Sequence, residues 1–179
     1  MKTTAAALLL ALPLGGLARG AEPVPDRTVV LTMDDGVRSH LTVAAPLLKE
    51  YGFGATFFIP QLWREDPANF LSWSEVAQLH EMGFEIGNHS WSHPDFGSPK
   101  TAARMAGELA LVENELSKVG VPKPVSFAWT GNFFSPEAWK TLRDCGYAFA
   151  RRGMQPEVPY GVTAPGPLYE PTLHDPLLI

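Results

Sequence analysis

Two acidic residues, Asp34 and Asp35, stand side by side at the end of an apolar run and are followed by Gly36. Two adjacent carboxylates at the end of a buried strand are costly unless something neutralises them, and a divalent cation is the obvious candidate. Gly36 lets the backbone turn sharply enough for both side chains to approach one cavity. An Asp-Asp-Gly triplet is more often a solvated turn, so the triplet alone does not establish a metal site.

Two histidines, His89 and His93, are spaced so that a single helical turn would place both imidazoles within reach of one ion. A zinc protease of the zincin type needs glutamate directly after the first histidine, and Ser90 at that position excludes it. Two histidines and one carboxylate form a common catalytic metal set that leaves positions open for water and substrate. Such a set favours zinc as the first choice and leaves cobalt and manganese open.

The elements that must position these residues alternate between short β-branched or apolar runs and longer amphipathic runs. This alternation predicts repeated strand-helix units around a parallel sheet, in which ligands and catalysts gather where the strands end. We expect strands over residues 28–32, 54–59, 84–87, 125–128 and 147–150. We expect helices over residues 42–51, 72–83, 101–119 and 135–146.

Two segments at predicted strand ends resemble motifs of a known family. Residues 32–36, Thr-Met-Asp-Asp-Gly, are similar to the first motif of the polysaccharide deacetylases, which act on chitin oligomers, peptidoglycan and related N- or O-acetylated glycans. Residues 88–93, Asn-His-Ser-Trp-Ser-His, look like the second motif of the same family. The resemblance covers about residues 28–152 and implies an α/β fold, a distorted (β/α) barrel of the polysaccharide deacetylase type.

The resemblance also implies a role for each residue of the two motifs. It makes Asp34 the general base and Asp35 a metal ligand. His89 and His93 complete the implied ligand set. The implied reaction is metal-dependent hydrolysis of acetyl groups on a glycan, with water activated by the metal and by the base. The alternatives are a non-catalytic glycan-binding relic of the fold and a hydrolase of a C–N bond in a non-glycan substrate.

The third motif of the family departs from its usual form here. An arginine usually follows the strand residue and helps to set the base, but Ala128 stands at that position, as it does in a subgroup with a similar segment over residues 127–132. The resemblance makes the backbone N–H of Gly131 the candidate oxyanion donor. Trp129 beside it is equally compatible with core packing and with substrate contact.

The late leucine-x-histidine motif, which supplies the general acid of the family, is not found in the sequence. His174 directly follows a leucine inside a proline-rich segment, residues 156–176, and is interpreted as an ordinary loop residue. His40, near the start of the first predicted helix, and His80, on the second, are likewise interpreted as ordinary residues without a catalytic role. Residues 177–179 look like the opening of another buried strand. We therefore expect the chain to be a fragment that lacks its last strand-helix units.

Residues 1–20 have the composition of a secretory signal peptide, with Lys2 followed by an uncharged, leucine-rich stretch that is too short for a membrane span. This predicts export to the periplasm or the medium and leaves residues 21–179 as one deacetylase-like domain. That domain carries 12 basic and 19 acidic residues, a net charge of −7, which argues against a nucleic-acid partner and suits a neutral glycan. Cys145, the single cysteine, is expected to be a buried apolar residue and not a nucleophile. The sequence leaves the oligomeric state open.

Overall fold

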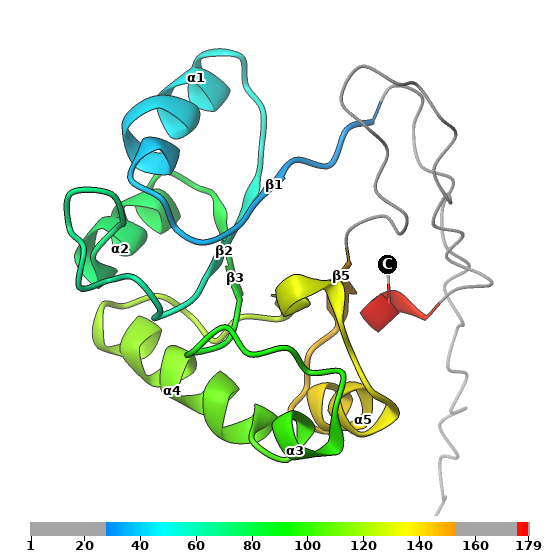
Figure 1. The fold of residues 1–179 in the computed structure, drawn as a ribbon. Helices are drawn as coiled ribbons and strands as arrows, with labels where there is room; N and C mark the ends of the chain where they lie inside the picture. The colour runs from blue at the N-terminus through cyan, green and yellow to red at the C-terminus, as the bar shows by residue number, and fades with distance from the viewer. Residues whose placement is uncertain (1–27, 153–174, 179) are drawn as a thin grey trace, which may run out of the picture.

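The computed structural model describes residues 28–152 and 175–178. Five parallel strands form one sheet in chain order, and the sheet curls into a half-barrel with the helices along one side (Figure 1). The strands are β1 (Thr32–Met33), β2 (Thr56–Ile59), β3 (Glu85–Asn88), β4 (Ser126–Ala128) and β5 (Phe149–Arg151). The parallel sheet with alternating helices that the sequence predicts is confirmed.

The helices connect consecutive strands and pack on the sheet. They are the π-helix η1 (His40–Ala44), which continues into α1 (Ala45–Glu50), then α2 (Trp73–Glu81), α3 (Pro99–Ala102), α4 (Met105–Lys118) and α5 (Pro136–Asp144). Two short 3₁₀ helices are η2 (Thr130–Asn132) and η3 (Pro176–Leu178). Within the described ranges, none of these helices has the length and apolarity that a bilayer crossing requires. The predicted signal segment and most of the proline-rich segment lie outside the described residues.

Two of the predicted elements differ most from the observed ones, the first strand and the helix after β3. β1 begins only at Thr32, because Val29 and Val30 are 62% and 80% exposed and pair with no strand in the described part of the chain. The helix expected over residues 101–119 is interrupted between α3 and α4, where Arg104 precedes the first residue of α4. A β-branched run therefore predicts a strand only where a neighbouring strand can pair with it.

The strand predicted over residues 177–179 is wrong where the structure describes it. Residues 176–178 form the 3₁₀ helix η3, and Leu177 is buried in the core beneath β4 and β5. The carboxylate of Asp175 accepts a hydrogen bond from the Leu177 N–H at 2.9 Å, and the Asp175 carbonyl accepts one from the Leu178 N–H at 2.9 Å. These local bonds satisfy the backbone in a turn, and the apolar side chain is buried without strand pairing.

Helix α2 begins with a capping box that Ser72 and Glu75 form. The Ser72 hydroxyl accepts a hydrogen bond from the Glu75 N–H at 3.3 Å, and the Glu75 carboxylate accepts one from the Ser72 N–H at 2.8 Å. That backbone hydrogen bond is the largest of the causes that lower the pKa of Glu75, and Arg38, 2.8 Å away, adds to it. The ionised form of Glu75 therefore stabilises the folded chain.

Replacing Glu75 with glutamine is expected to lower the free energy of unfolding at pH 7 by about 1 kcal/mol. Because the folded-state pKa is lowered, this contribution is present above the unfolded pKa and disappears as pH falls through the folded value. Urea unfolding of both proteins at pH 7 and near pH 3 would measure the difference, with Glu50→Gln at the end of α1 as the matched control. An equal difference at both pH values would contradict the expectation.

Candidate metal centre

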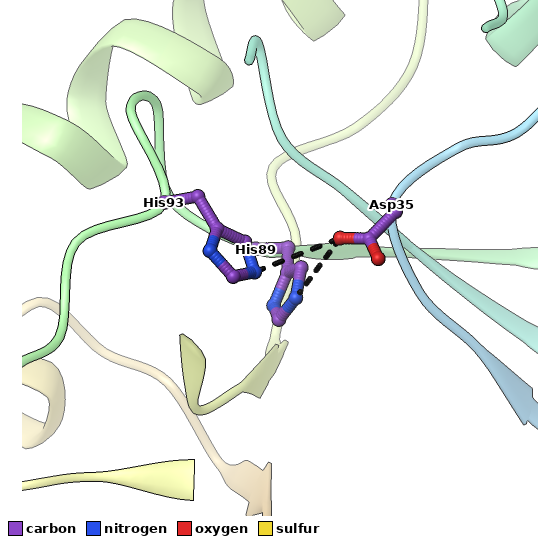
Figure 2. Close-up of side chains that lie close together, drawn as sticks. All are labelled: Asp35, His89 and His93. Carbon is purple, nitrogen blue, oxygen red and sulfur yellow. Dashed lines mark ion pairs between the residues drawn. The ribbon is translucent and has the colours of Figure 1, made fainter. Parts of the chain in front are cut away.

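Three side chains meet where β1 and β3 end. Asp35 follows β1, His89 follows β3, and His93 lies farther along the same loop. The Oδ1 atom of Asp35 lies 3.6 Å from the Nε2 atom of each histidine, and the three ligand atoms all lie within 4.8 Å of one another (Figure 2). The structure thus brings together the three residues that the sequence singles out as ligands, because parallel strands present their carboxyl ends at one edge.

The surroundings of Asp35 fit a divalent cation. Its Oδ1 atom is buried and has no hydrogen-bond partner among the described residues. A buried carboxylate oxygen without a partner is costly, and a bound cation would remove that cost. Ligand atoms that surround one zinc ion tetrahedrally stand about 3.3 Å apart, close to the 3.6 Å separations between Asp35 and each imidazole.

The His89 ring is held in the tautomer that a metal ligand needs. Its Nδ1 atom lies 2.8 Å from the carbonyl oxygen of Ala128, the last residue of β4, so the Nδ1–H donates and Nε2 presents its lone pair toward Asp35. Burial lowers the pKa of His89, with the Asp34 carboxylate opposing that effect. A neutral imidazole oriented by a backbone carbonyl is the usual form of a histidine ligand.

The loop between the two histidines is not the helical turn that their spacing predicts. Ser90 and His93 have left-handed backbone angles, with φ of 64° and 51°, and Asp35 across the site has a φ of 72°. Side chains replace the missing helical bonds, because Asn88 Oδ1 accepts from the Ser90 N–H at 2.8 Å and the Ser90 hydroxyl accepts from the His93 N–H at 3.1 Å. The imidazoles converge through this turn and not through a helix face.

Glu108 on α4 anchors this loop, and the sequence analysis did not identify it. Its side chain is nearly buried, and its carboxylate accepts hydrogen bonds from the Ser92 N–H at 2.6 Å, the Ser92 hydroxyl at 2.8 Å and the Trp91 N–H at 3.0 Å. The Arg104 guanidinium lies 2.7 Å from the Glu108 carboxylate and neutralises its charge. A carboxylate on the apolar face of a predicted helix was the available signal, because such a group must have buried partners.

Replacing Glu108 with alanine is expected to lower the affinity for zinc about tenfold to a hundredfold, as loss of an outer-sphere support does in other metal sites. The N–H groups of Trp91 and Ser92 would lose the Glu108 carboxylate that accepts their hydrogen bonds, and the loop would no longer hold His93 in place. Isothermal titration with zinc would measure the change. Glu115→Ala is the control, because Glu115 lies on the same helix and pairs with Lys118 at the surface. Equal affinities of the two variants would refute the anchoring role.

Asp34, the predicted base, lies on the edge of the cluster. Its Oδ2 atom is 3.9 Å from His89 Nε2, and its Oδ1 atom accepts a hydrogen bond from Arg151 at the end of β5. Arg151 thus binds one carboxylate oxygen of Asp34, while the other oxygen faces the candidate metal ligand His89. His40, at the start of η1, also lies within the electrostatic field of Asp34 and Asp35, although burial lowers its pKa.

The two predicted residues of the third motif occupy different environments. Trp129 is 2% exposed, and its indole N–H donates to the Leu177 carbonyl at 2.8 Å, which corresponds to the packing alternative. Gly131 lies exposed in η2, on the turn that follows β4. The Thr130 hydroxyl of this turn donates to the Pro94 carbonyl, which ties η2 to the loop that carries His93. The oxyanion role of Gly131 stays a prediction.

A groove of about 460 Å³ lies beside the histidine loop. Its lining includes Trp63, Trp91, Glu65 and Asp66. The Trp63 ring lies 5.3 Å from the His93 ring, and its indole is 38% exposed. Through Trp63 the groove offers an aromatic surface close to His93.

The remaining candidates are His80, His174 and Cys145. His80 lies on α2, and His174 lies outside the described residues. Cys145 is half-buried at the end of α5 and is not the fully buried residue expected. Burial raises the pKa of its thiol, so the reactive thiolate is disfavoured, in line with the expectation that it is no nucleophile.

Comparisons with known proteins agree with this geometry. Among curated relatives, the peptidoglycan-N-acetylmuramic acid deacetylase PdaA of Bacillus subtilis is 30% identical over 95 residues, which cover 52% of this chain and 34% of that protein. The chain thus spans about a third of that relative's length.

Solved structures share the fold. IcaB from Ammonifex degensii is similar with a TM-score of 0.62 and 24% identity, over 71% of this chain and 60% of that one. A CE4 family pseudoenzyme from Bacillus anthracis is similar with a TM-score of 0.58 and 21% identity, over 68% of this chain and 41% of that one. These likenesses confirm the expected (β/α) barrel type. Residues 21–150 match the polysaccharide deacetylase family, so the chain belongs to that family.

Proposed function

We propose that this protein is a metal-dependent hydrolase that removes acetyl groups from an N- or O-acetylated polysaccharide. The observation that carries the proposal is the buried Asp35 Oδ1 atom, which has no hydrogen-bond partner among the described residues and lies 3.6 Å from the Nε2 atoms of His89 and His93. Asp34 stands next to this set with one carboxylate oxygen directed toward it. Membership of the deacetylase family supports the same reaction class. Zinc is the metal that we expect, with cobalt or manganese as substitutes.

Each residue of the site has a separate role in the proposed hydrolysis. Asp35, His89 and His93 would hold the metal, which when bound lowers the pKa of water and polarises the acetyl carbonyl. Asp34 accepts a proton from the attacking water through its Oδ2 atom. The water oxygen bonds to the acetyl carbon, and the bond from that carbon to the sugar nitrogen or oxygen breaks. The leaving atom takes up a proton from solvent, and Asp34 returns to solvent the proton that it accepted. The Gly131 N–H is our candidate donor to the oxyanion.

The groove beside His93 supports a sugar polymer as the substrate. The exposed part of Trp63 offers an apolar ring face next to the metal cluster, and the acidic Glu65 and Asp66 offer hydrogen-bond acceptors to hydroxyl groups. Aromatic faces with a few polar groups are the usual lining of small-molecule sites. We also propose export, as residues 1–20 predict, which would place the protein with extracellular glycans.

Acetate release from acetylated chitooligosaccharides and from peptidoglycan fragments would test this function. We expect release by the zinc-loaded chain, none after chelation, and recovery when zinc is restored. The activated ester 4-nitrophenyl acetate is a useful second substrate, because its leaving group departs without protonation. Glycan binding without turnover of any of these substrates would favour the non-catalytic alternative. Turnover confined to a non-glycan amide would favour a different C–N hydrolase.

A further inference from the structure

Arg151 contacts the predicted base from a distant part of the chain. It is the last residue of β5, and its guanidinium donates a hydrogen bond to Asp34 Oδ1 across 117 positions of sequence. The two side chains are 28% and 31% exposed, so the ion pair is half-buried and only partly screened by solvent. The strand order places β1 and β5 at opposite edges of the sheet, and the curl of the half-barrel brings the ends together (Figure 1).

The inner face of the sheet fixes the direction of the Arg151 side chain. Its guanidinium carbon lies 5.4 Å from the centre of the Phe58 ring on β2. That ring in turn covers Gly87 on β3, where a Cβ atom would stand only 2.3 Å from it. The guanidinium is therefore supported by an aromatic surface whose position depends on a glycine, and it approaches Asp34 as a preorganised cation.

Ala128 and Arg151 are paired residues of neighbouring strands. β4 and β5 run parallel with Ala128 in register with Arg151, and paired positions point to the same face of a sheet. Ala128 stands at the position where the deacetylases usually have an arginine. Arg151 thus stands on the neighbouring strand, in register with Ala128 and on the same face of the sheet.

We propose that Arg151 is a positioning residue for Asp34, which it holds by Oδ1 so that Oδ2 faces the reacting water. The inference rests on the proposed function for its kinetic consequences. It also has a consequence that does not depend on turnover. Asp34 Oδ2 lies 3.9 Å from His89 Nε2, scarcely farther than Asp35 Oδ1 at 3.6 Å, so Arg151 keeps the first carboxylate from joining the second as a metal ligand.

Kinetics of Arg151→Ala would test the positioning role, with Arg152→Ala as the matched control because Arg152 lies over Phe134 instead. We expect kcat to fall about a hundredfold with KM unchanged, since misplacement of a catalytic group acts on the chemical step. Added guanidinium ion, or Ala128→Arg in the Arg151→Ala background, is expected to restore part of kcat. Arg151→Lys, which keeps the charge, should show a smaller loss. A kcat for Arg151→Ala equal to that of Arg152→Ala would overturn the inference while leaving the proposed function intact.

The visible absorption spectrum of the cobalt-loaded chain gives a readout without turnover. Arg151→Ala is expected to change the spectrum by releasing Asp34 to the metal, and Asp34→Asn in the same background is expected to reverse the change. Arg152→Ala should match the wild type. If the wild type releases no acetate, the proposed function fails, but this spectrum still decides on Arg151. An unchanged spectrum of Arg151→Ala would overturn its role.

Discussion

Replacing Asp34 with asparagine is expected to lower kcat for acetate release about a hundredfold to ten-thousandfold, the range that general-base catalysis contributes. The amide has nearly the same shape and still accepts a hydrogen bond from Arg151 through its oxygen, but it cannot take a proton from water. Steady-state kinetics on acetylated chitooligosaccharide would measure the change.

Metal binding separates this loss from a structural one. Asp34 is not among the three clustered ligand atoms, so the zinc affinity of Asp34→Asn is expected to stay within a few-fold of the wild type. Asp144→Asn controls for the loss of one negative charge, because Asp144 lies at the end of α5 and pairs with Lys140 at the surface. If Asp34→Asn turned over substrate at the wild-type rate, Asp34 would not be the base.

Replacing His89 with alanine is expected to lower zinc affinity by more than about a hundredfold, beyond the usual effect of an outer-sphere change. The substitution removes the Nε2 ligand, and it leaves the Ala128 carbonyl without the donor that it has at 2.8 Å. We expect His89→Ala to lose both zinc binding, measured by isothermal titration, and acetate release. His80→Ala on α2 is the control, because that histidine lies outside the cluster. Zinc binding by His89→Ala at wild-type affinity would exclude the proposed centre.

Much of the site could be predicted because its residues follow strands. Asp35 lies two residues after the end of β1 and His89 directly after the end of β3, and the geometry of a parallel sheet brings such positions to one edge. Gly36, with a φ of 63°, makes the turn that its type predicts, and a Cβ atom there would stand 3.2 Å from the Arg64 guanidinium. Local residue type and sheet topology together are sufficient to predict this part of the site.

The supporting residues could not be placed in the same way, because their partners are set by tertiary structure. Glu108 binds backbone groups of a loop 16 and 17 positions earlier, which no helical spacing reveals. Arg151 reaches Asp34 only because the sheet curls, and the motif directed attention to Ala128 on the neighbouring strand. Sequence patterns therefore predicted the residues of the candidate metal centre better than the residues that hold them in place.

The left-handed backbone at Asp35 and His93 sets up a trade-off between stability and activity. Each residue carries a conformation that costs an ordinary side chain about 1–2 kcal/mol, and glycine adopts it freely. Glycine at either position would therefore relieve strain in the metal-free chain while deleting a ligand. A library selected for thermal stability alone, without zinc, is expected to enrich glycine at these two positions. Stabilising engineering of this fold should keep both positions fixed and look for its gains elsewhere.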